Sequence, residues 1–144
     1  MNENLPAERR AIELGIKEAF RGVTWGGVSW SEAEVLYWYG SDDECKAARL
    51  RDLDRMWQEL VEDSNWVSDS GIGGWSFLDA DGFRYYLPAA MTRRLRSGFD
   101  EGIVFHLTLP DSGELRDYTL EQWSLLNMSD QICVRRFLQL HGRS

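Results

Sequence analysis

The chain has 144 residues, of which 43% are hydrophobic and 28% are charged, and its formal net charge is −8. These values are typical of a globular protein, and the length suffices for one domain that buries about two-thirds of its unfolded surface. They exclude a disordered or fibrous chain. An acidic surface also disfavours binding to nucleic acid or to an anionic membrane. We therefore expect a single domain over residues 1–144.

The cellular compartment is predicted from segments that the sequence lacks and from its cysteines. No apolar run approaches the roughly 20 residues that a membrane-spanning helix needs. Residues 1–10 contain no hydrophobic core of a secretion signal. Cys45 and Cys133 are the two thiols, and buried free cysteines in a reducing cytosol explain them better than a disulfide does. We expect a cytoplasmic protein.

The N-terminal part of the sequence has the pattern of helices. Apolar residues at helical spacing predict an amphipathic helix over residues 6–23. Ser31–Glu34 has the spacing of a capping box, which predicts a short helix that ends with Gly40 in a left-handed conformation. Ser41–Glu44 repeats this signal and opens a third helix to about Glu62. The apolar stripe of that third helix is Leu50, Leu53, Trp57, Leu60 and Val61.

The centre of the sequence has the pattern of a β-hairpin. Aromatic and polar residues alternate on both sides of Asp79–Gly82, a segment with the composition of a tight turn. Pro88 is then expected in the first turn of a helix that stops near Ser97. The residues that share the inner face of this hairpin are Trp75, Phe77, Phe83, Tyr85 and Leu87.

The C-terminal part predicts one more strand, followed by helices. Residues 103–109 are β-branched and aromatic without a breaker, which predicts a strand, and residues 115–118 are a candidate return strand. Thr119–Gln122 resembles a third capping box, and Ser129 is the expected cap of the last helix. The predicted fold class is α+β: a small antiparallel sheet of three to four strands, with a central hairpin over 75–87, covered by five to six helices.

Aromatic residues near the N-terminal helices are the strongest hint of function. A helix of about eight residues cannot turn four consecutive large side chains inward, so some of these rings should stay exposed as anchors for a partner. The alternative is that the glycine-rich loop or a second copy covers them. The candidate partner-binding residues are Trp25, Trp30, Tyr37, Trp38, Tyr39 and Trp66.

A basic segment interrupts the otherwise acidic chain. It is a candidate anion patch, although the solvated side of one helix explains it more simply. The arginines of this patch are Arg84, Arg93, Arg94 and Arg96.

Catalytic and metal chemistry have weaker support. His106 with Asp79, Asp81 or Arg84 would form an acid–base cluster or a small-ligand site if the fold brought them together. A structural histidine explains His106 more simply. Asp79–Gly82 begins like a calcium loop but lacks its later ligands. No cofactor or metal motif occurs, so neither is expected.

Three segments resemble a small uncharacterised bacterial family, the DUF6714-like proteins. They are Ser76–Met91, residues 28–33 together with Tyr39–Asp42, and Ile103–Thr108. The similarity extends from about Ala11 to Leu138. It implies a compact, cytosolic, stand-alone domain and supplies no catalytic residue.

The leading functional hypothesis is a non-enzymatic protein-binding module, of the kind in which an acidic immunity protein inhibits a basic toxin. An enzyme or small-ligand binder that uses His106 is the first alternative. A nucleic-acid mimic, whose carboxylates stand in for phosphates, is the second. The sequence leaves the partner and the choice between monomer and dimer open.

Overall fold

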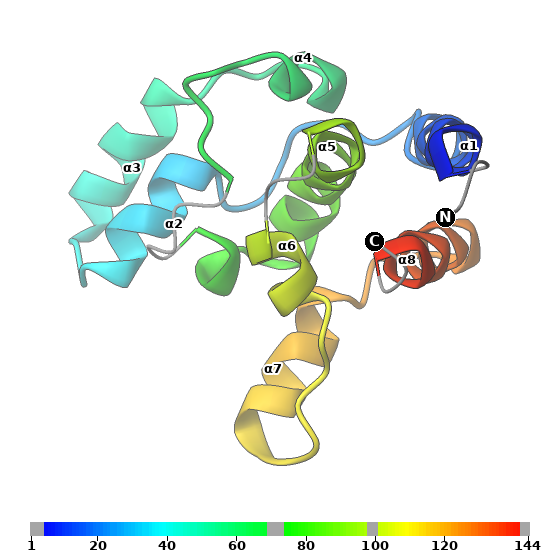
Figure 1. Cartoon of the computed structure of the whole chain (residues 1–144). Coiled ribbons are helices and arrows are strands. Elements are labelled where there is room, and N and C mark those ends of the chain that lie inside the picture. Colours follow the sequence, from blue (N-terminus) through cyan, green and yellow to red (C-terminus); the bar gives the residue numbers. More distant parts are fainter. Residues whose placement is uncertain (1–4, 69–73, 98–100, 142–144) are drawn as a thin grey trace.

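The structure, a computed structural model, describes residues 5–68, 74–97 and 101–141, and these residues form helices without a strand among them (Figure 1). The predicted α+β class and its antiparallel sheet are therefore wrong. The elements in chain order are α1 (Leu5–Ala19), α2 (Trp30–Tyr37), α3 (Asp42–Arg51), α4 (Trp57–Val61), the 3-10 turn η1 (Trp75–Phe77), α5 (Ala80–Ser97), α6 (Glu101–His106), α7 (Gly113–Gln122) and α8 (Met128–His141).

Helix α5 is the centre of the fold. It packs against α1, α4, α6 and α7, while α1 pairs with α8 and α2 pairs with α3 (Figure 1). Its residues from Gly82 to Thr92 are buried, with Arg84 as the half-buried exception. A helix that is apolar on nearly every side must lie inside the protein. Helices α1, α4, α6 and α7 pack around α5 for this reason, and one hydrophobic core results.

The segment predicted as a hairpin turn is instead the N-terminus of α5. Asp79 Oδ1 accepts a hydrogen bond from the backbone N–H of Gly82 at 2.9 Å, which is the work of an N-cap. The same oxygen accepts from the backbone N–H of Val28, also at 2.9 Å. A single carboxylate thus begins the central helix and fixes the chain just before α2.

The rings that were expected on one hairpin face are mostly buried, although not through strand periodicity. Trp75, Phe83, Tyr85 and Leu87 lie in the core, whereas Phe77 is 38% exposed. Pro88 lies inside α5 rather than at its start. A proline in a helix interior costs about 3 kcal/mol, and burial of the surrounding apolar side chains offsets this cost.

The predicted strands 103–109 and 115–118 are also wrong. Residues 103–106 belong to α6, where Ile103 is buried, and 115–118 belong to α7. Thr119 is not a cap, because its hydroxyl donates to the carbonyl of Leu115 within α7. Strand propensity reflects packing on a pleated surface more than an intrinsic backbone preference, so tertiary contacts overrode it here.

The helix caps follow the predicted chemistry at partly different residues. Ser41 and Glu44 form the predicted capping box of α3. In α2, Ser29 and Glu32 form the box, two residues before the predicted pair Ser31–Glu34.

The third and last predicted helices also differ from the structure. The third is divided into α3 and α4, and this leaves Leu50 and Leu53 exposed. At α8, Asn127 rather than Ser129 receives the capping bond, from the backbone N–H of Asp130. Cys45 and Cys133 are buried and free, as expected.

Candidate protein-binding surface

The six aromatic residues that the sequence singles out divide into buried and exposed groups. Trp30 and Trp66 are core residues, packed edge to face with ring centroids 5.4 Å apart. Trp25 is half-buried beneath the guanidinium of Arg49, which lies 4.3 Å from the ring centroid. These three indoles are held by the fold itself and are not free anchors for a partner.

Tyr37, Trp38 and Tyr39 are exposed at the C-terminal end of α2. Their exposed fractions are 40%, 67% and 97%. The ring of Tyr37 lies edge to face with Trp38, at 5.0 Å between centroids, and with Phe77 of η1 at 6.1 Å. We call these four residues the aromatic surface. Phe77 was missed as a site residue because the expected strand placed it inside.

Tyr39 holds a backbone conformation that suits glycine better than tyrosine. Its φ is +60°, and it occupies the left-handed position after the C-cap Trp38. The backbone N–H of Gly40 donates to the carbonyl of Val35 at 3.0 Å, and that of Tyr39 donates to Leu36 at 3.1 Å. These two bonds define a Schellman motif. The sequence suggests Gly40 as the left-handed residue, but the structure places Tyr39 there.

Carboxylates follow the aromatic surface directly in the chain. The first turn of α3 carries Asp42, Asp43 and Glu44, all exposed. The backbone N–H and then the hydroxyl of Ser41 bond to Glu44 and lower the pKa of its carboxyl group. Negative charge at a helix N-terminus is stabilised by the helix dipole. The rings of α2 are therefore followed by a turn of three exposed acidic residues.

The arginines of the candidate anion patch are engaged within the protein. Arg84 Nε donates to the buried carboxylate of Asp130 at 2.9 Å. Arg96 contacts Glu13 and Glu62, each at 2.8 Å. Arg93 donates to four backbone carbonyls between residues 60 and 66. Arg94 is half-buried.

The residues of the predicted acid–base cluster have separate structural roles. His106 lies in α6 against Trp75, with ring centroids 6.3 Å apart, and burial lowers the pKa of its imidazole. Asp79 caps α5 and Arg84 pairs with Asp130, while Asp81 is exposed. The cavities of about 370, 420 and 640 Å³ are lined by other residues. Among the described residues, none of these three cavities brings His106 together with Asp79, Asp81 or Arg84.

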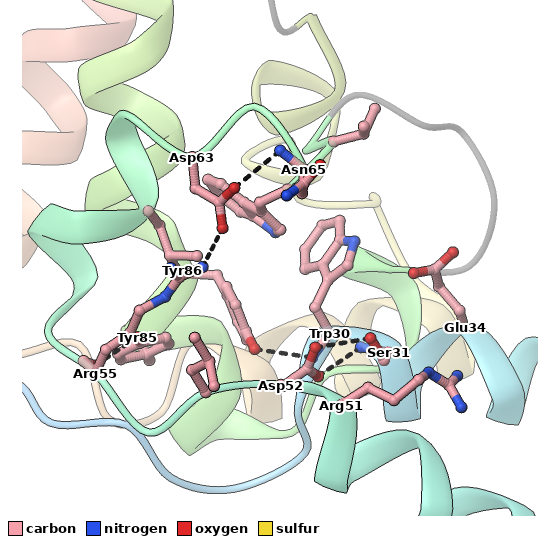
Figure 2. Close-up of a pocket in the computed structure, with 14 residues that line it drawn as sticks. Trp30, Ser31, Glu34, Arg51, Asp52, Arg55, Asp63, Asn65, Tyr85 and Tyr86 are labelled. Carbon is pink, nitrogen blue, oxygen red and sulfur yellow. Dashed lines mark hydrogen bonds and ion pairs between the residues drawn. The ribbon is translucent and has the colours of Figure 1, made fainter.

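A polar cavity of about 370 Å³ lies between α2, the segment from α3 to α4, and α5 (Figure 2). Ser31 donates to both oxygens of Asp52, from its backbone N–H at 2.8 Å and from its hydroxyl at 2.7 Å. Arg55 pairs with Asp63 on the opposite side. No pattern in the sequence predicted this cavity, because Asp52 and Arg55 were expected on the solvated face of a continuous helix.

Glu34 lines the same cavity, and the sequence interpretation had placed it in a capping box. Burial raises the pKa of its carboxyl group, the negative charge of Asp52 raises it further, and Arg51 opposes both effects. A half-buried carboxylate with a raised pKa in a concave site is a candidate functional group.

Comparison with known proteins places the chain in a family without assigning it an activity. The family of unknown function DUF6714 matches residues 8–143, so the chain belongs to that family, as the resemblance in its sequence indicated. No curated protein and no solved structure matches the chain. Across the described ranges, each helix is too short or too polar to cross a membrane.

Proposed function

We propose that this protein is a non-enzymatic protein-binding module, an immunity-type inhibitor that captures a basic toxin through the aromatic surface. The observation that carries the proposal is Tyr39, which is 97% exposed while its backbone holds a left-handed φ of +60°. This conformation costs a residue other than glycine about 1–2 kcal/mol. Because the ring is almost fully exposed, its packing within the fold does not offset this cost. This is the pattern expected of a residue that makes an external contact.

The neighbouring rings support the same use. Trp38 is 67% exposed and packs edge to face on Tyr37, so its ring already has a packing contact before a partner arrives. Tryptophan and tyrosine dominate the energetics of protein interfaces because each buries a large area at low cost in side-chain entropy. A pair of exposed rings that pack on each other therefore suits the centre of an interface.

The charge distribution favours a basic partner. The chain carries a formal charge of −8, and the acidic turn Asp42–Glu44 directly follows the aromatic surface. An acidic rim around aromatic anchors accelerates encounter with a positively charged protein and disfavours acidic ones. Two buried, free thiols accord with action in the cytoplasm, which we include in the proposal.

The proposal is tested by capture and by rescue of growth. The immobilised protein is exposed to an extract of the cells that produce it, beside Trp38→Ala and a control, Leu14→Ala, whose side chain has a matched exposure of 66%. We expect a basic protein to be retained by the wild type and Leu14→Ala and lost by Trp38→Ala. When expressed alone, that protein should arrest growth, and co-expression of the wild type should restore it.

Two outcomes would overturn the proposal. One is capture that is unchanged by Trp38→Ala. The other is a captured protein that is harmless when expressed alone, which would remove the immunity role. Thermal unfolding of Trp38→Ala should stay close to the wild type because most of this ring is already in water.

A further inference from the structure

The 370 Å³ cavity between α2 and α5 contains an indole donor that the fold leaves unused. Trp30 is only 5% exposed, and its backbone N–H donates to the hydroxyl of Tyr86 at 2.8 Å. Its side-chain Nε1–H has no acceptor among the described residues, although the ring lines the cavity. This nitrogen is not among the buried atoms that lack a partner, so water can reach it, whereas Nε1 of Trp66 in the same cavity lining is buried without a partner. An acceptor supplied by a ligand would take the place of water on Trp30 Nε1.

Glu34 is the corresponding unused acceptor. Within the described part of the chain its carboxylate has no hydrogen-bond donor and no ion-pair partner, even though Arg51 lines the same cavity. Figure 2 shows Glu34 on the same side of the cavity as the Trp30 indole, and Asp63 on the other side. Arg55 and the backbone N–H of Asn65 already bind Asp63. A cation entering the cavity would therefore find its open position at Glu34.

The remaining lining residues limit the chemistry of the occupant. Leu53 and Val67 are 64% and 56% exposed and line the cavity, so they offer apolar surface to an aliphatic stem. Three carboxylates line the cavity beside two arginines, and Arg55 is already paired with Asp63. This balance disfavours an anion. An apolar stem that ends in a cation, beside a hydrogen-bond acceptor, describes a basic amino-acid residue within a peptide.

We propose that this cavity binds an arginine side chain of a peptide or protein, with the guanidinium on Glu34 and the adjacent peptide carbonyl on Trp30 Nε1–H. The inference rests on the proposed function in one respect, that a basic protein is the natural source of the side chain. The guanidinium presents several donors in a plane and suits a carboxylate better than a single ammonium does. The cavity is thus a second, polar recognition element beside the aromatic surface.

The test uses the purified protein and a small probe, so that it does not depend on finding the partner. N-acetylarginine amide is titrated while the assigned indole N–H signals are followed by ¹⁵N NMR. The neutral analogue N-acetylcitrulline amide tests the need for charge, and agmatine, which lacks the carbonyl, tests the contact with Trp30. Glu34→Gln is compared with Glu114→Gln, an exposed glutamate of α7 that does not line the cavity.

We expect the Trp30 Nε1–H signal to shift saturably with the arginine probe and to stay unchanged with the citrulline probe. Glu34→Gln should weaken binding about 10-fold or more, the range for a hydrogen bond to a charged group, and Glu114→Gln should not. An absent shift, equal binding of citrulline, or equal binding by Glu34→Gln would overturn the inference. If agmatine binds as tightly as the arginine probe, the contact between Trp30 and a peptide carbonyl is wrong, and the ligand is a free cation instead of a residue in a peptide.

These outcomes are independent of the toxin-inhibitor proposal. That proposal fails if Trp38→Ala captures the partner normally, whatever the arginine probe does. The cavity proposal fails on the isolated protein, whatever the capture experiment yields.

Discussion

The hydroxyl of Tyr86 accepts a hydrogen bond of 2.8 Å from the backbone N–H of Trp30, and so connects the central helix α5 to the first turn of α2. Both residues are buried, with exposed fractions of 2% and 5%. Tyr86→Phe removes the acceptor and strands this N–H inside the protein. We expect a loss of about 1–3 kcal/mol in the free energy of unfolding, measured by urea denaturation.

A matched control separates the hydrogen bond from the general effect of losing a hydroxyl. Tyr39→Phe makes the same chemical change on a side chain that is 97% exposed, and its stability should stay within about 0.5 kcal/mol of the wild type. Equal stability of the two variants would contradict the role assigned to Tyr86.

Buried phenols should also make the fold sensitive to alkali. Burial raises the pKa of Tyr86 from 10.0 to about 12, and burial, followed by the charge of Tyr86, raises that of Tyr85 further. Between pH 10 and 12 the unfolded chain releases these protons while the folded protein retains them. Stability should therefore be complete below pH 10 and decline as the pH rises through this window.

Melting temperatures measured from pH 9 to 11.5 check this dependence. We expect the decline to be shallower in Tyr86→Phe, because one of the two phenols is gone. A decline of unchanged steepness would show that other groups control alkaline unfolding.

The ion pair between Arg84 and Asp130 connects α5 to α8 around a fully buried carboxylate. Asp130 Oδ2 accepts from Arg84 Nε at 2.9 Å and from the backbone N–H of Asn127 at 3.0 Å. Arg84→Met would leave a buried charge without its counter-ion. We expect a cost of about 3 kcal/mol, the lower end for breaking a buried pair, since Arg84 is partly exposed.

The double variant Arg84→Met with Asp130→Asn makes this prediction specific. Removing both charges should restore part of the lost stability, and chemical denaturation of the wild type and three variants gives the coupling energy. Additive effects of the two single changes would mean that the pair contributes little as a pair.

Replacement of Tyr39 by glycine should separate stability from binding. Glycine removes about 1–2 kcal/mol of strain from the left-handed conformation. It also increases the conformational entropy of the unfolded chain, which lowers the free energy of unfolding by about 0.5–1 kcal/mol. We expect a net gain of roughly 0.5–1 kcal/mol in stability from this balance, together with weaker capture of the partner. Thermal unfolding and the capture assay measure the two effects on the same preparation, and a variant that gains stability without losing capture would count against the aromatic surface.

Association with a basic partner should depend on salt. Because the charge of −8 steers encounter, the association rate constant should fall several-fold between 20 mM and 300 mM NaCl, while the dissociation rate constant changes less. Surface plasmon resonance at several ionic strengths gives both constants. An association rate that is flat across this range would argue for a neutral or acidic partner.

The sequence predicted the N-terminal helices and failed at the central one for a physical reason. Capping boxes and one apolar stripe are local signals, and they located α1, α2 and the start of α3. Tyr85, Tyr86 and Leu87 are all buried in α5. The sequence therefore shows neither the 3.6-residue period of an amphipathic helix nor the two-residue period of a strand at this point. This burial hides the half of α5 before Pro88, whereas the half from Pro88 to Ser97 was predicted as a helix.

The candidate sites also differ in whether they depend on local sequence signals or on long-range packing. Exposed rings among residues 36–39 followed from helix geometry alone. Helix geometry could not predict which indoles are exposed. Trp30 and Trp66 are covered by segments whose positions depend on long-range packing. The cavity between α2 and α5 depends entirely on such long-range packing.

The two hydrogen bonds of Asp79 Oδ1 have a consequence for how the aromatic surface would meet the partner that we propose. Gly27, at φ +70°, lies so close to this junction that an added Cβ would come within 2.3 Å of Asp79 Oδ1, and one on Gly82 within 2.5 Å of the Val28 carbonyl. The segment that leads into α2, residues 27–28, is thereby held against the N-terminus of α5. Tyr37 and Trp38 are presented on a platform ordered in advance, so that docking need freeze side chains rather than backbone, and the entropy lost on complex formation stays small.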